Sequence, residues 1–497
     1  MRLACLYVPS FPLAALLRAE PDLHGEPVAV VDGQGGARAQ ILAVAPPAAR
    51  RGVTIGLSVA QAMALDAGLV VRHVSADTVR AAQEALCDAA ASFSPRVEDA
   101  GAGLVYLDLE GLGVLFDSVS QLANALARRA AHLGLAAQVG VAGSKVAAYL
   151  AARHGGGVVV IPRGEEWKFL APAPIELLEP SVELTNTLHR WGIRCIGDLV
   201  ALPASAVGTR LGPEGVLLVR RARGEDAYPL SPRPVSLHFE EGVECEYGIA
   251  TLEPFLFVLR GVLDRLTARL AVRGLVCGDL HLSLHLATRG RDDRTITVAA
   301  PSNDVKSLLT LVRLQLETHP PAAAIEAVRV GAIPERLCAA QLDLFHPNGP
   351  APARLATTLA RLAAICGADR VGTPVVADSY RPDAYGVAPF QVARLLGCDV
   401  ARHHLTTHNL APPALRAVRP PHGVEVFCER DRPEFVRGEH FAGRVVQAAG
   451  PWRMQGEWWN AGGYARDYYD AQLSDGCVYR LYCDLTTHSW FVDGVYD

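Results

Sequence analysis

Short apolar runs alternate with helical patterns over the first 165 residues. Runs rich in Val, Ile, Leu and Ala predict strands at 3–8, 27–31, 40–44, 104–109, 137–141 and 158–161. Between them, apolar residues at helical spacing predict helices over 77–93 and 118–133, with shorter ones at 58–65 and 144–154. This alternation predicts an α/β or α+β domain over residues 1–165.

The pattern changes twice before residue 340. Residues 166–230 are short helical stretches broken by Gly and Pro, as at Gly212-Pro213. Residues 231–338 predict a strand near 236–240, a helix over 253–273, strands at 278–287 and 296–300, a helix over 304–318 and a strand at 325–330. A second, small α+β domain is therefore expected there.

The last third of the chain is different again. Pro347-Asn348-Gly349-Pro350 makes 339–350 a linker, and 351–421 reads as a helix over 354–365 followed by irregular chain. Residues 422–497 hold four of the six Trp and alternate aromatic with polar positions. We expect a small β-rich domain at this end of an α+β multidomain protein.

Composition limits the possible functions. The formal net charge of −5 argues against tight autonomous DNA binding, because phosphate contacts require a basic surplus. Eleven Cys without a CxxC pair indicate reduced thiols, neither disulfides nor zinc ligands. With no membrane-length apolar run and no signal peptide, we expect a cytoplasmic protein that does not contact membranes.

Three segments carry a family resemblance. They are RGVTIGLSVAQA at 51–62, GAGLVYLD at 101–108 and VGVAGSKVA at 139–147. In order and spacing they resemble the fingers segment, the carboxylate strand and the strand–helix turn of Y-family translesion DNA polymerases, and the whole chain is similar to the ImuB type of that family. The resemblance implies a palm and fingers at 1–165, a helical thumb at 166–230 and a little finger at 231–338.

The resemblance fails at the positions that carry polymerase chemistry. Family members hold two divalent ions on palm carboxylates, which activate the primer hydroxyl and steady the leaving pyrophosphate. In this chain Tyr7, Gly103 and Leu104 occupy those carboxylate positions, and the Tyr and Arg that hold the triphosphate fall near Pro46 and Ala49. This pattern predicts a pseudo-polymerase with no catalytic residue, no metal and no cofactor.

An alternative stays open at the remaining acids. Asp108 and Glu110 are two residues apart on a predicted strand, and with Asp99 they suggest a displaced Mg²⁺ site in a low-activity translesion polymerase. Structural or solvated roles for the same acids are the other interpretation. A structural adaptor without any DNA role is a third possibility.

The candidate DNA contacts are few. Lys145 lies in the strand–helix turn, and Arg220, Arg221 and Arg223 end a thumb helix. The two thumb turns that would present backbone N–H groups to phosphate carry Glu179 and Glu214. Only weak primer–template binding is therefore expected.

Gln341-Leu342-Asp343-Leu344-Phe345 resembles the motif by which bacterial proteins bind the β sliding clamp of DNA polymerase III. Leu344 and Phe345 would enter an apolar pocket while the Gln341 amide fixes the register. A buried helix end is the alternative.

The C-terminal region resembles the extension of ImuB-type proteins, which implies an error-prone C-family DNA polymerase and a RecA-like accessory protein as partners. Its aromatic residues fit either a partner interface or a domain core. His403, His404 and His408 suggest a metal, but without nearby Cys or acids we interpret them as surface or turn residues.

Overall fold

The computed structural model describes most of the chain. The described residues are 2–31, 36–226, 228–234, 236–298, 301–336, 355, 358–359, 361–362, 366–367, 370–379, 384–388, 414–430, 432–459 and 463–496. The chain divides into two compact units, 1–365 and 366–497. We call 2–222 the first module, 239–336 the second module and 415–496 the barrel.

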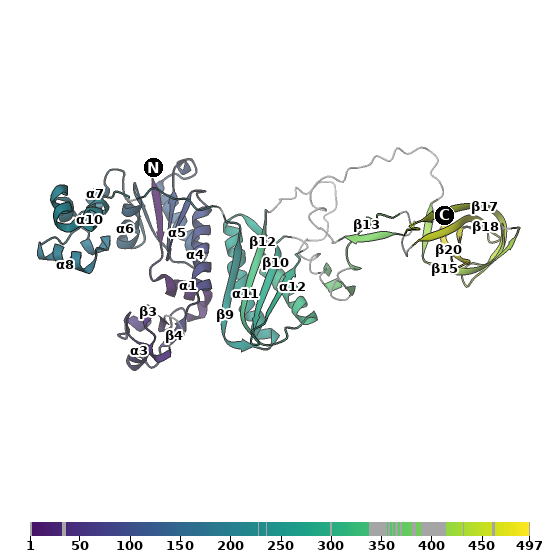
Figure 1. Cartoon of the computed structure of the whole chain (residues 1–497), viewed down its shortest axis with the longest axis horizontal. Coiled ribbons are helices and arrows are strands. Elements are labelled where there is room, and N and C mark those ends of the chain that lie inside the picture. The colour runs from purple at the N-terminus through teal and green to yellow at the C-terminus, as the bar shows by residue number, and fades with distance from the viewer. Residues whose placement is uncertain are drawn as a thin grey trace. The chain divides into compact units, whose positions relative to one another are not determined.

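A five-stranded sheet forms the centre of the first module (Figure 1). Its order is β5-β6-β1-β7-β8, with β1 antiparallel to both neighbours, so that Tyr7 lies opposite Leu104 and Gln138. The strands are β1 (Leu3–Tyr7), β5 (Val97–Gly101), β6 (Leu104–Asp108), β7 (Gln138–Ala142) and β8 (Val158–Val160).

Helices cover both faces of this sheet. Ala4 and Leu6 face α1 (Phe11–Ala19), α4 (Ala76–Ala91) and α5 (Val119–His132) in one buried cluster. Leu3, Cys5 and Tyr7 face the other side, where α6 (Lys145–Gly155) packs on β7. Because side chains alternate along a strand, the two faces belong to different cores.

A separate three-stranded sheet, β3-β2-β4, lies between β1 and α4 in the chain. Its elements are β2 (Val28–Val31), β3 (Ile41–Val44), α2 (Pro46–Ala49), α3 (Val59–Leu65) and β4 (Val70–His73). A capping box starts α3, because the Ser58 side chain accepts from the Gln61 N–H and the Gln61 side chain accepts from the Ser58 N–H.

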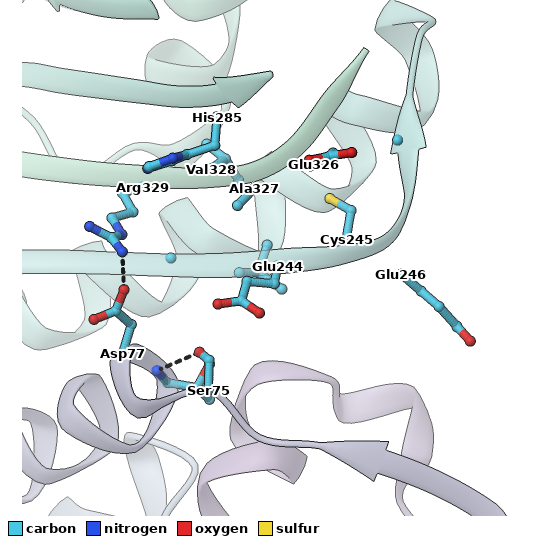
Figure 2. A pocket seen from close by; sticks show the side chains of 14 residues that line it. Ser75, Asp77, Glu244, Cys245, Glu246, His285, Glu326, Ala327, Val328 and Arg329 are labelled. Carbon is cyan, nitrogen blue, oxygen red and sulfur yellow. Dashed lines mark hydrogen bonds and ion pairs between the residues drawn. The ribbon is translucent and has the colours of Figure 1, made fainter. Parts of the chain in front are cut away.

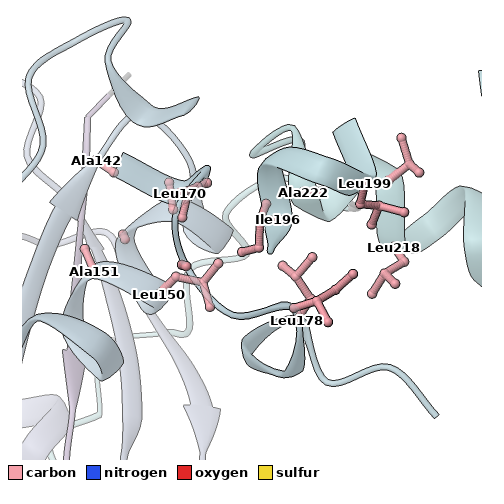
Figure 3. Close-up of a cluster of buried hydrophobic side chains, with 14 of the residues drawn as sticks. Ala142, Leu150, Ala151, Leu170, Leu178, Ile196, Leu199, Leu218 and Ala222 are labelled. Carbon is pink, nitrogen blue, oxygen red and sulfur yellow. The ribbon is translucent and has the colours of Figure 1, made fainter. Parts of the chain in front are cut away.

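The helical segment expected at 166–230 continues the core of α6. Figure 3 shows Leu150 and Ala151 beside Leu170, Leu178, Ile196 and Leu218 in one apolar cluster. A kink at Gly212, where φ is +65°, interrupts α10 at the predicted Gly-Pro break. The elements are α7 (Glu166–Leu170), η4 (Ile175–Leu178), α8 (Val182–Arg190), α9 (Ile196–Val200) and α10 (Ala204–Ala222).

The second module is a four-stranded antiparallel sheet, β11-β10-β12-β9, with two helices on one face. Buried Leu and Val side chains of both helices fill the space against the sheet. The elements are β9 (Phe239–Ile249), α11 (Leu252–Val272), β10 (Leu275–Leu286), β11 (Arg291–Ile296), α12 (Val305–Thr318) and β12 (Ile325–Arg336).

The C-terminal unit confirms the expected β-rich domain and closes it into a barrel of β15 to β20. Two short strands, β13 (Thr373–Val376) and β14 (Tyr385–Ala388), pair as a hairpin in the same unit. The barrel strands are β15 (Leu415–Glu429), β16 (Arg432–Arg437), β17 (Gly443–Gly456), β18 (Tyr464–Leu473), β19 (Val478–Asp484) and β20 (Ser489–Tyr496).

Several sequence-based predictions were wrong where polar residues form strands. The strand predicted at 296–300 lies instead at β11, a charged strand that pairs with β10 and ends at Ile296. Its charges pair along the strand, Arg291 with Asp293 and Arg294 with Asp292. The strand expected at 236–240 is the acidic β9, which continues to Ile249. An apolar-run criterion also misses α1, β4 and β5.

The expectation of irregular chain over 366–421 was wrong in two places. The β13–β14 hairpin lies there, and β15 begins at Leu415 in spite of Pro420 and Pro421. Both prolines fall where the pairing of β15 with β20 is interrupted, between Ala417 and His422, so neither removes a ladder hydrogen bond. In the part of the chain that the structure describes, no helix is long and apolar enough to cross a membrane.

Candidate functional site

The three positions expected to carry catalytic carboxylates lie together at one end of the first sheet. Tyr7 ends β1 and lies opposite Leu104 in the register of β1 with β6. The N–H of Val8 donates to the carbonyl of Gly103 at 2.9 Å. The structure therefore brings Tyr7, Gly103 and Leu104 to one place, and none of the three side chains is acidic.

Gly103 cannot be exchanged freely for an acid. Its φ is +80°, and a Cβ atom added there would lie 2.7 Å from Cδ2 of Phe11. Tyr7 places its ring edge-on to Tyr149 of α6 with centroids 5.6 Å apart, and Leu104 packs beside the same cluster. Aromatic and apolar packing thus fills the place where a metal site would need open oxygen ligands.

One acid that sequence reasoning missed, Glu98, faces this side of the sheet. Glu98 lies opposite Tyr106, which is on the same face as Tyr7. Its carboxylate accepts from Nζ of Lys145 at 2.9 and 3.1 Å, and both side chains are only 16% exposed. The N–H of Ser231 donates to the same carboxylate at 2.7 Å. The alternation of side chains along β5 is the signal that could have identified Glu98, but β5 was not predicted from the sequence.

Lys145 is consequently enclosed by its own chain. Its Nζ also donates to the carbonyl of Pro229 at 3.2 Å and lies 5.7 Å from the ring centre of Tyr106, whose pKa is raised by burial. The carboxylate of Asp226 accepts from the backbone N–H groups of Lys145 and Val146 at 2.9 and 3.0 Å. Carboxylates of the chain therefore bind both the Lys145 ammonium and the backbone N–H groups at the start of α6. A phosphate would otherwise bind at these groups.

Of the three acids of the alternative site, Asp99 is not brought together with Asp108 and Glu110, whose N–H donates to Asp108 at 3.0 Å. Asp108 is 2% exposed and accepts from Arg96 at 2.7 Å, while Asp99 lies opposite Val105 on the other face of the sheet. Asp99 accepts from Gln83 at 2.6 Å and from Arg233 at 3.2 Å. Structural roles account for both acids.

No group of three or more His, Cys, Asp or Glu arranged to hold a metal ion is found among the described residues. That observation covers all five strands of the first sheet, because residues 2–31 and 36–226 are described.

The helical segment also presents acids at its turns. Glu214 accepts from the N–H and hydroxyl of Ser181, the N-cap of α8, at 2.9 and 3.1 Å. Glu179 pairs with Arg153. A negative side chain at the start of α8 opposes a phosphate at the same place.

The three candidate arginines at the end of α10 lie in different surroundings. Arg220 pairs with Glu225 at 3.3 Å, with both side chains about half exposed. Arg221 donates to the carbonyl of Leu178 at 3.4 Å, and Arg223 is exposed. Contacts of these residues and of Lys145 with DNA stay predictions. Gln341 to Phe345 and the histidines at 403, 404 and 408 lie outside the described residues.

Comparison with known proteins finds proteins similar to this chain. Residues 6–153 match the model of the impB/mucB/samB family. Protein ImuB of Caulobacter vibrioides is 28% identical over 466 residues, which cover 90% of this chain and all of that protein. DNA polymerase IV of Dehalococcoides mccartyi is 32% identical over 214 residues, which cover 42% of this chain and 55% of that protein.

Among solved structures, DinB from Sulfolobus solfataricus aligns with 67% of this chain and 99% of its own, at 16% identity and a TM-score of 0.42. Residues 6–153 are thus similar to the impB/mucB/samB family, and the chain is similar to protein ImuB over 90% of its length.

Proposed function

We propose that this chain is a non-catalytic Y-family polymerase homologue that acts as a hub for mutagenic translesion synthesis after DNA damage. The observation that carries the proposal is the sheet end at Tyr7, Gly103 and Leu104, where packed rings and a glycine replace metal ligands. The neutralised Glu98–Lys145 pair supports it, because neither charge is free for an ion or a triphosphate. The similarity to ImuB and to DNA polymerase IV supports a role in DNA-damage tolerance with weak primer–template contact.

The test of the catalytic part is primer extension with purified full-length protein, Mg²⁺ and all four dNTPs. We expect no extension, whereas a DNA polymerase IV in the same assay extends the primer. Mg²⁺-dependent extension that disappears in Asp108→Ala would favour a displaced active site instead.

The proposed tether is the motif at 341–345, through which the chain would bind the β sliding clamp. Two apolar anchors are expected to carry most of the binding energy. We expect Leu344→Ala with Phe345→Ala to abolish capture of the clamp in a pull-down. Asp343→Ala is the matched control, since its position in the motif is not an anchor, and it should retain binding.

The proposed partners are an error-prone C-family DNA polymerase and a RecA-like accessory protein. The barrel supplies a surface of suitable chemistry, because Trp452, Trp458 and Trp459 are exposed while Tyr468 and Tyr482 are buried. Exposed Trp side chains are enriched in interface anchors. Trp458→Ala with Trp459→Ala should weaken capture of such a partner without unfolding the barrel, as checked by circular dichroism.

The DNA contact can be tested by binding primer–template at low salt, where phosphate contacts are strongest. We expect measurable but weak affinity that falls steeply as salt is added. Complete absence of binding would favour an adaptor that has no direct DNA role.

A further inference from the structure

Charged side chains are buried where the two modules of the first compact unit meet. Helices α1 and α4 of the first module lie against β9 and α11 of the second at this contact. Six charged residues form one network there, and we call it the ionic lock: Arg18, Asp88, Glu241, Arg265, Arg269 and Arg273.

Glu241 on β9 is the centre of the lock. Arg18 of the first module donates to both of its oxygens, at 2.9 and 2.7 Å, and both side chains are almost fully buried. Arg269 and Arg265 of α11 approach the same carboxylate at 3.1 and 3.4 Å. Burial alone would raise the pKa of Glu241, but Arg18 and then the other two guanidinium groups outweigh it and lower the pKa to about 2.

Asp88 on α4 is the second anchor in the first module. Arg269 bridges the modules, because its Nε donates to Asp88 at 2.8 Å while its Nη1 donates to Glu241. Arg273, at the end of α11, reaches Asp88 at 3.2 Å. Each module thus contributes an acid that pairs with arginines of the other module. Glu241 of the second module pairs with Arg18, and Asp88 of the first pairs with Arg269 and Arg273.

Further contacts border the lock. Figure 2 shows Arg329 on β12 pointing across to Asp77 at the start of α4, with which it forms an ion pair. Arg72 on β4 reaches Glu246 at 3.4 Å. The cavity between these elements has a volume of about 420 Å³ and is lined by both modules. Beside the lock, Val272 and Ala268 of α11 pack against the apolar core of the first module.

Buried ion pairs contribute little net stability compared with apolar packing, but removing one partner leaves an uncompensated buried charge and is very costly. Such a network therefore selects one relative orientation. We propose that the ionic lock fixes the second module on the first as a single body, and that the two modules separate, each still folded, when the lock is broken. DNA would then meet a fixed surface without a rearrangement of the second module.

Three buried cysteines allow a direct test in the full-length chain. Cys87 on α4 lies beside Asp88 and shares a small cavity with Arg273 and the connecting residues Pro234 and Ser236. Cys5 lies in the core of the first module and Cys277 in the core of the second. All three are nearly inaccessible, and burial raises the pKa of Cys87 and of Cys277 to about 12. Alkylation of Cys87 reports separation, and the other two thiols report unfolding of each module.

The experiment follows alkylation of each thiol by peptide mass spectrometry. In the unsubstituted chain, Cys87 should react as slowly as Cys5 and Cys277. In Glu241→Gln, Cys87 should react on the order of a hundredfold faster, given the cost of an unpaired buried charge, with Cys5 and Cys277 unchanged. Glu244→Gln, an exposed acid on the same strand, is the matched control and should change nothing.

Arg273→Met is a milder variant for the case in which Glu241→Gln unfolds the protein, because Arg273 lies at the edge of the network with a single acid, Asp88. In this variant, alkylation of Cys87 should be about tenfold faster, with alkylation of Cys5 and Cys277 unchanged. Rapid alkylation of Cys87 in the unsubstituted chain would overturn the proposal, since the contact would then open freely. Equal acceleration of all three thiols in both variants would also overturn it, since the network would then stabilise the whole fold and not the contact.

Discussion

The sheet end around Tyr7 and the contact between the two modules use charge in opposite ways. At the sheet end, where the sequence resemblance led us to expect clustered acids, the chain has Tyr7, Gly103 and Leu104, and the nearby Glu98 is held by Lys145. At the module contact, where apolar packing would suffice, the chain buries Glu241 and Asp88 among four arginines. Acids are thus absent from positions 7, 103 and 104 but are buried at the module contact.

The physical difference is the number of partners available to each acid. Glu98 has one ammonium and one backbone N–H, on a partly exposed face. Glu241 has three guanidinium groups and no solvent, so its charged form survives complete burial. An acid without such partners would be protonated or excluded from either place. Three predictions test this contrast, from the largest expected effect to the smallest.

The largest effect should be acid sensitivity of the module contact. The pKa of Glu241 is about 2 in the folded chain against an ordinary 4.5, so the folded state holds the proton less tightly. The stability that the charged Glu241 contributes to the module contact is fully present above about pH 4.5 and is lost as the pH falls toward 2. This loss of stability amounts to about 3 kcal/mol. Burial raises the pKa of Asp88, so Asp88 opposes part of this loss.

The measurement is hydroxyl-radical labelling, between pH 7 and 2.5, of the side chains of β9 and α11 that face the module contact. Labelling should be low at pH 7 and rise as the pH falls in the unsubstituted chain and in Glu244→Gln, but be high and nearly independent of pH in Glu241→Gln. A steep rise at low pH that persists in Glu241→Gln would assign the acid sensitivity to other carboxylates.

The second effect concerns restoring an acid at the sheet end. Gly103→Asp combines a left-handed backbone with overlap on Phe11, and should cost about 2 to 3 kcal/mol in urea unfolding of the first module. Gly101→Asp is the matched control, because φ is +74° there but nothing lies within 4 Å of the added Cβ. It should cost about 1 kcal/mol. Equal costs would mean that Phe11 moves aside easily.

The smallest effect should follow from freeing Lys145. Glu98→Gln removes the carboxylate and should destabilise the first module by about 1 kcal/mol, since a buried donor loses its charged partner. The released ammonium should also raise primer–template affinity a few-fold at low salt, measured by fluorescence anisotropy. Glu225→Gln, which frees the exposed Arg220, should leave stability within about 0.5 kcal/mol. Unchanged affinity in Glu98→Gln would remove Lys145 from the candidate DNA contacts.

The sequence predicted the apolar elements well and the polar ones poorly. Strands such as β1 and β7 are nearly continuous apolar runs, and α11 has apolar residues at helical spacing, so local pattern was sufficient. β9 and β11 are strands in spite of their charges. In β9, Glu241 pairs with Arg269 of α11, whereas in β11 the charges pair along the strand itself, Arg291 with Asp293 and Arg294 with Asp292. The sequence alone did not reveal that Arg269, 28 residues after Glu241, is its partner.

The candidate site shows the same division. Family motifs located Tyr7, Gly103 and Leu104 without any coordinates, and the register of β1 with β6 brings them together. Two contacts could not be read from spacing. One is the pairing of Lys145 with Glu98, 47 residues earlier, and the other is the pair of hydrogen bonds that the backbone N–H groups of Lys145 and Val146 donate to Asp226, some 80 residues later.

By itself, the sequence determined that positions 7, 103 and 104 carry no acid, because residue identity needs no folding. It also determined the order of the elements, since apolar periodicity is a local property. Only the tertiary structure decided which remaining acids stay charged in the interior. That outcome depends on guanidinium and ammonium groups brought within about 3 Å from distant parts of the chain, as Arg18 is brought to Glu241 across 223 residues.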